Sequence, residues 1–147
     1  MRQVTKLLIT VISGFYLACL LMPGLEEHLF FNMYALMVLG NSLESAIGPK
    51  KFLSIFVISQ IGASLASIYF GAFNVVSVGA SGAIFGLFGA MIVLSKKYGL
   101  ETKSTYVIVG INFAIGFIFP GIDWHAHLGG LISGFIAASV LLAPARS

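Results

Sequence analysis

The longest segment without a charged residue decides the fold class of this chain. It comprises residues 52–95, FLSIFVISQIGASLASIYFGAFNVVSVGASGAIFGLFGAMIVLS, and its 44 residues include no Lys, Arg, Asp or Glu. A helix that spans a membrane needs about 20 apolar residues, with a range of about 17–25. The segment is therefore long enough for two spanning helices, and a turn between them is expected near residues 71–74.

The composition also indicates a membrane protein. Hydrophobic residues make up 59% of the 147-residue chain and charged residues 9%, and the mean hydropathy is +1.03. Soluble domains are about 45–50% apolar and about 25% charged. These values exclude a soluble enzyme and a disordered tail. A nucleic-acid-binding module is also excluded, because the net charge of +3 comes from short basic clusters between apolar runs. The single cysteine, Cys19, cannot form a disulfide within the chain.

Four further charge-free stretches complete the pattern, at residues 7–25, 29–43, 104–122 and 128–145. Together with the central segment they predict an all-α membrane protein in which six helices form a single domain over residues 1–147. The expected helices cover approximately residues 7–22, 28–46, 51–71, 77–95, 104–120 and 125–143.

The distribution of charge predicts the orientation of these helices. With six spans, one side of the membrane receives all eight basic residues, namely Arg2, Lys6, Lys50, Lys51, Lys96, Lys97, Lys103 and Arg146. The opposite side receives Glu26, Glu27 and Asp123. Because cytoplasmic loops are enriched in Lys and Arg, both termini are expected in the cytoplasm. The small size favours a bacterial inner membrane. The basic N-terminus also resembles a signal peptide, but no small-x-small cleavage site follows it.

Polar side chains gather where three of the expected helices begin. The second helix begins with His28 and carries Asn32 one turn later, the fourth carries Ser81, and the sixth carries His127. All three helices enter from the same, outer side, so these groups are expected in one layer of the membrane. Small residues at a spacing of four follow on two of the helices and favour close helix packing; these are Gly82, Gly86 and Ala90, and Gly130, Gly134 and Ala138.

These residue types suit nucleophilic catalysis. A serine hydroxyl becomes a good nucleophile when a neighbouring base removes its proton, and imidazole is the usual base. Ser81 is therefore the candidate nucleophile and His127 the candidate base. An oxyanion would be bound by His28, by Asn32 and by the backbone N–H of Ser81. Because Asp123 is expected in a loop, a Ser–His dyad is favoured over a triad.

At these positions the sequence resembles the rhomboid family of intramembrane serine proteases. Residues 79–86, GASGAIFG, are similar to the family's nucleophile motif, and residues 126–134, AHLGGLISG, to its helix-6 motif. Residues 28–33, HLFFNM, are similar to its oxyanion motif. The GxxxExxxG pattern of the family is matched by Gly40, Glu44 and Gly48. The resemblance covers roughly residues 28–143.

The resemblance implies a function and further site residues. Phe85 matches an aromatic position whose ring packs on the catalytic imidazole, and Gly79, Gly82 and Gly130 belong to the supporting motifs. The implied activity is cleavage of transmembrane segments of other membrane proteins within the bilayer, with no metal or organic cofactor and no nucleic-acid partner. The oligomeric state is not implied.

Two other functions compete with this interpretation. Family members usually have a long loop between the first two helices, often with a Trp-Arg pair, whereas only residues 23–27 join them here. This difference motivates the alternative of a catalytically inactive, rhomboid-like protein that binds transmembrane helices. A small transporter or channel is disfavoured, because transporters place polar sites near the membrane midplane and contain internal repeats.

Overall fold

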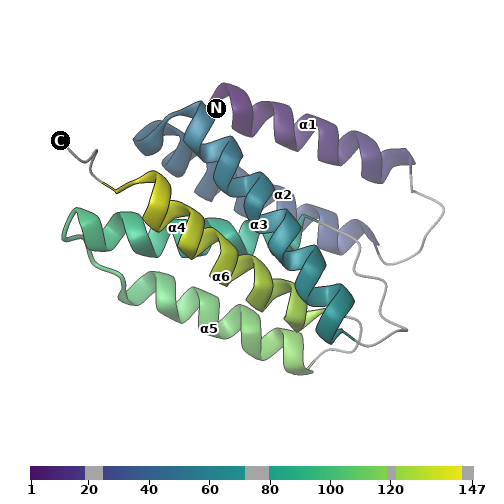
Figure 1. Ribbon diagram of the computed structural model, residues 1–147. Helices are drawn as coiled ribbons and strands as arrows, with labels where there is room; N and C mark the ends of the chain where they lie inside the picture. The colour runs from purple at the N-terminus through teal and green to yellow at the C-terminus, as the bar shows by residue number, and fades with distance from the viewer. Residues whose placement is uncertain (19–24, 72–79, 119–121, 144–147) are drawn as a thin grey trace. The chain divides into compact units, whose positions relative to one another are not determined.

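The computed structural model describes residues 1–18, 25–71, 80–118 and 122–143, without the side chains of residues 16, 18, 25–28, 116 and 117. All regular structure in these ranges is α-helical (Figure 1). The helices are α1 (Gln3–Ala18), α2 (Leu25–Ile47), α3 (Pro49–Phe70), α4 (Ser81–Lys97), α5 (Lys103–Ile118) and α6 (Trp124–Leu141). The prediction of an all-α chain with six helices is therefore confirmed.

The chain divides into two compact units, residues 1–53 and residues 54–147. In the first unit α1 and α2 lie side by side (Figure 1). α2 ends where Gly48 adopts a φ of +83°, a conformation that glycine tolerates best, and Pro49 opens α3 directly afterwards. Proline suits the first position of a helix because it lacks the N–H that would have no acceptor there.

A buried carboxylate explains why α1 begins earlier than expected. The sequence predicts a start near residue 7, after Lys6, whereas the helix begins at Gln3. The Glu44 carboxylate on α2 accepts hydrogen bonds from the Val4 amide at 2.9 Å and from the Thr5 amide and hydroxyl, both at 2.7 Å. The first N–H groups of a helix have no acceptor within the helix, so this carboxylate caps α1.

We expect Glu44→Gln to lower the free energy of unfolding by about 2 kcal/mol, because hydrogen bonds to a charged group are strong and a buried donor without a partner is costly. A glutamine has one oxygen where the carboxylate has two, so its NH₂ would face the donor of Val4 or those of Thr5, and Thr5 is fully buried. Reversible unfolding in detergent micelles measures this change.

Glu101→Gln is the matched control, since Glu101 is exposed and accepts a hydrogen bond from the Ser104 hydroxyl at 2.6 Å near the start of α5. Glu101→Gln should lower the free energy of unfolding clearly less than Glu44→Gln does. Equal losses in the two variants would contradict a special role for the buried carboxylate.

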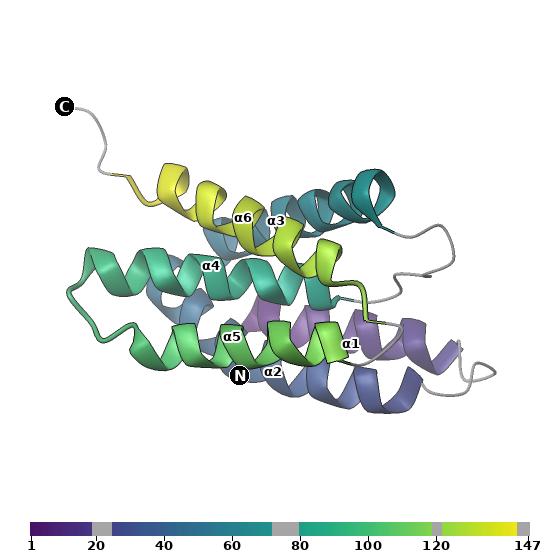
Figure 2. The same cartoon turned by 90° about the horizontal axis from the view of Figure 1, so that it is seen from below.

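In the second unit, α4 has α6 on one side and α5 on the other (Figure 2). Residues of α3 also contact both α4 and α6, since Ala63 faces Gly82 and Ala66 faces Gly129. α4 begins at Ser81, later than the predicted residue 77, and residues 72–79 lie outside the described part of the chain. Most residues of α4 are buried within the unit.

Two described helices are long and apolar enough to cross a membrane. These are α3, with 22 residues, and α6, with 18 residues. Within the described residues, shorter apolar helical stretches cover Gln3–Phe15 and Lys103–Ile115. The predicted ends of the first and fifth helices, at residues 22 and 120, lie outside the described ranges.

Candidate active site

Ser81 and His127 lie next to each other in the second unit. Ser81 is the first residue of α4, and His127 lies in the first turn of α6. The distance between Ser81 Oγ and His127 Nε2 is 3.2 Å, within hydrogen-bonding range. A neutral imidazole accepts at Nε2 when Nδ1 carries the proton, so this geometry suits transfer of the serine proton to the ring.

Glycines allow the two helices to come this close. A Cβ atom on Gly130 of α6 would overlap the carbonyl oxygen of Gly82 on α4, and one on Gly134 would overlap the backbone of Gly86. The backbones are therefore in direct contact over more than one helical turn. This contact brings the serine at the start of α4 to the imidazole in the first turn of α6.

Aromatic rings hold the imidazole in place. The Phe85 ring lies parallel to the His127 ring, with centroids 4.1 Å apart and an angle of 11° between the planes. The ring of Phe113 on α5 meets the imidazole edge-on at 6.4 Å. His127 is only 8% exposed. The sequence did not single out Phe113, because it is one of many apolar residues in α5.

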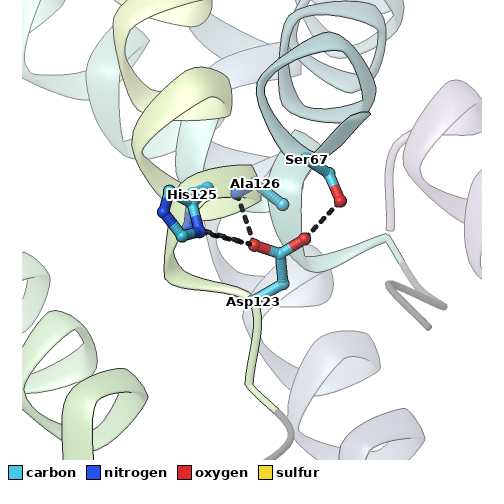
Figure 3. Close-up of polar contacts among 4 residues, drawn as sticks. All are labelled: Ser67, Asp123, His125 and Ala126. Carbon is cyan, nitrogen blue, oxygen red and sulfur yellow. Dashed lines mark hydrogen bonds and ion pairs between the residues drawn. The ribbon is translucent and has the colours of Figure 1, made fainter. Parts of the chain in front are cut away.

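Asp123 lies just before α6, outside the helix as expected, and is its N-cap (Figure 3). Its Oδ1 atom accepts hydrogen bonds from the amides of His125 and Ala126, both at 3.1 Å. Its Oδ2 atom accepts a hydrogen bond from the Ser67 hydroxyl on α3. The His125 ring lies 3.5 Å from the carboxylate and against the Trp124 ring. Sequence reasoning did not identify Ser67.

The other predicted site residues lie elsewhere in the chain. His28 and Asn32 belong to α2 and hence to the unit of residues 1–53. Asn32 is half-buried, and the side chain of His28 is not described. Gly79 lies outside the described residues. Among the predicted residues, the structure thus brings together Ser81, His127, Phe85, Gly82 and Gly130.

A sequence model of the rhomboid domain matches residues 12–144, which is most of the chain. The chain belongs to the rhomboid family. This confirms the resemblance inferred from the motifs. Rhomboid domains are integral membrane domains, so the chain is an integral membrane protein. The search of solved structures found no match.

Three relatives show the range of the family. The chain is 42% identical over 122 residues to rhomboid protease GluP of Bacillus subtilis (strain 168), covering 80% of this chain and 24% of that protein. It is 38% identical over 134 residues to RHOMBOID-like protein 5 of Arabidopsis thaliana, covering 86% and 43%. It is also 38% identical over 122 residues to inactive RHOMBOID-like protein 8 of the same plant, covering 78% and 34%. The chain thus spans less than half of the length of these rhomboid relatives.

Proposed function

We propose that the protein is an intramembrane serine endopeptidase that cleaves transmembrane segments of other membrane proteins with a Ser81–His127 dyad. The observation that carries this proposal is the 3.2 Å distance between the Ser81 hydroxyl and the His127 imidazole. The stacked Phe85 ring adds support, because it fixes the ring plane. The 42% identity to a rhomboid protease points in the same direction.

The proposed reaction proceeds through an acyl-enzyme. His127 accepts the proton of Ser81 Oγ as the oxygen attacks the scissile carbonyl carbon, and it then donates this proton to the leaving amine. Water hydrolyses the ester in a second round of the same chemistry. The backbone N–H of Ser81 is suited to bind the oxyanion, because the first N–H groups of a helix have no acceptor within the helix. His28 and Asn32 are proposed as the further oxyanion donors.

The setting of the reaction is also proposed. A single rhomboid-like domain would place Ser81 near the outer face of a bacterial inner membrane, with both termini in the cytoplasm. The substrates would be transmembrane segments of other membrane proteins, which would reach the site from within the bilayer. A peptide bond in an intact helix is shielded from attack, so substrates whose helix unwinds easily near small residues are favoured.

Covalent labelling tests the proposal. The detergent-purified protein is incubated with a fluorophosphonate, digested, and mapped by mass spectrometry. We expect one phosphonyl adduct, on the peptide that contains Ser81, and no adduct after heat denaturation. An adduct at another serine, or none on protein that circular dichroism shows to be folded, would contradict the proposal.

An inactive protein that binds transmembrane helices is the second candidate. It is favoured by the 38% identity to a relative named inactive and by the short connection between the first two helices. A folded protein that captures transmembrane peptides but gives no adduct would support this alternative.

A further inference from the structure

We propose that Asp123 and Ser67 are positioning residues that hold His127 in register with Ser81. This inference rests on the proposed protease function. It concerns a carboxylate that bridges two helices of the second unit, and neither residue touches the reacting atoms in the proposed mechanism. Their role would be to fix where the first turn of α6 lies.

The two oxygen atoms of Asp123 make different contacts (Figure 3). Oδ1 accepts the amides of residues 125 and 126 and so caps α6. Capping needs only this one oxygen. Oδ2 accepts the hydroxyl of Ser67, near the C-terminal end of α3. One carboxylate therefore fastens the beginning of α6 to a neighbouring helix.

The hydrogen bond between Ser67 and Asp123 acts four residues before His127 in the chain. The His127 amide donates to the Asp123 carbonyl oxygen at 3.2 Å, the first hydrogen bond of the helical ladder. Residues four apart lie on the same face of a helix on successive turns. A shift of Asp123 along or around the helix axis would therefore move His127 with it.

The other contacts of this turn are made by small or apolar groups. Gly129 meets Ala66 and Gly62 on α3, and Gly130 meets the backbone of Gly82 on α4. Small side chains and glycine surfaces let helices approach closely but offer little resistance to a slight sliding of one helix along the other. The hydrogen bond from Ser67 to Asp123 adds a directional constraint on that sliding. Asp123 is 9% exposed, so water does not readily replace Ser67.

Ser67→Ala separates this link from the cap, because it removes the hydroxyl and leaves Oδ1 with both amides. The dependence of the labelling rate on fluorophosphonate concentration gives a maximal rate and a half-saturating concentration. We expect the maximal rate to fall about tenfold in Ser67→Ala, since a misplacement well below 1 Å already weakens proton transfer. The half-saturating concentration should stay unchanged, because the probe pocket is not altered.

Two further variants distinguish positioning from general destabilisation. Ser67→Thr keeps the hydroxyl and should restore the maximal rate to within about twofold of the wild type, as expected when the hydrogen bond is retained. Ser64→Ala is the matched control, one turn earlier on α3 and exposed, and should label like the wild type. Thermal midpoints are measured for all variants. Asp123→Ala removes both the cap of α6 and the hydrogen bond with Ser67, so its maximal labelling rate should fall further than that of Ser67→Ala.

The outcomes separate this inference from the proposed function. A folded wild type without any adduct contradicts the proposed function and, with it, the positioning role. A labelled wild type with Ser67→Ala as fast as Ser64→Ala contradicts the positioning role alone. A Thr variant as slow as the Ala variant, with normal thermal midpoints, also contradicts it.

Discussion

Replacing His127 with alanine is expected to lower the rate of phosphonylation at Ser81, and the rate of peptide cleavage, by at least about 10³-fold. Ser81 Oγ lies 3.2 Å from the imidazole Nε2, so the ring is placed to take the serine proton. Without it, no base takes the proton of the hydroxyl during the attack, and the serine reacts slowly. The rates are measured with a fluorophosphonate and with a quenched transmembrane peptide in detergent micelles.

His125→Ala is the matched control for this experiment. His125 lies two residues before His127 and is half-buried. Its ring lies against Trp124 and the Asp123 carboxylate. Its backbone N–H, which Asp123 accepts, is unchanged by the substitution. We expect rates within about threefold of the wild type, the range of a substitution away from the reacting groups. If His125→Ala is as slow as His127→Ala, the assignment of the base is wrong.

Gly130→Ala is expected to reduce both stability and activity. The new Cβ would overlap the carbonyl oxygen of Gly82, and a backbone atom cannot move aside as a flexible side chain can. Separating α4 from α6 should lower the free energy of unfolding by about 1–3 kcal/mol. A displacement near 1 Å between Ser81 and His127 would slow labelling by about 10²-fold. Unfolding in micelles and labelling rates measure the two effects.

Gly110→Ala provides the control, since the new Cβ on α5 would meet no described atom within 4 Å apart from its own stretch of helix. The substitution removes a glycine from a helix just as Gly130→Ala does, but without the overlap. We expect unchanged labelling and a free energy of unfolding that is unchanged or higher by up to about 1 kcal/mol, because alanine favours a helix more than glycine does. Comparable losses in both variants would show that glycine flexibility, rather than close packing, is what matters at Gly130.

The sequence predicts the helices well, because each charged residue interrupts an apolar run and few such residues occur. It misplaces the start of α1 for a physical reason. The acceptor for its first amides comes from Glu44, about 40 residues away, and so Gln3 to Lys6 can be helical despite their polarity. Contacts between distant segments of this kind leave no local pattern.

The same reasoning explains which site residues sequence analysis finds. Ser81 and His127 stand out because polar side chains are costly in apolar helices. Ser67 does not stand out, since α3 contains several serines and nothing in the sequence says which one meets Asp123, 56 residues later. Phe113 is equally inconspicuous, because an aromatic ring in an apolar helix is ordinary lipid-facing or packing material until its neighbours are known.

The direct contact between the backbones of α4 and α6 also limits how this protein can be redesigned. At Gly130 and Gly134 there is no side chain to shorten, and any enlargement meets main-chain atoms of α4; at Gly82 and Gly86 an enlargement meets the side chains of Ala63 and Ser59 on α3. If the proposed activity holds, engineered changes in substrate preference are expected to come from other walls of the site. The ring of Phe113 on α5 is one such wall, and trimming it would open space beside the imidazole while leaving the contact between α4 and α6 untouched.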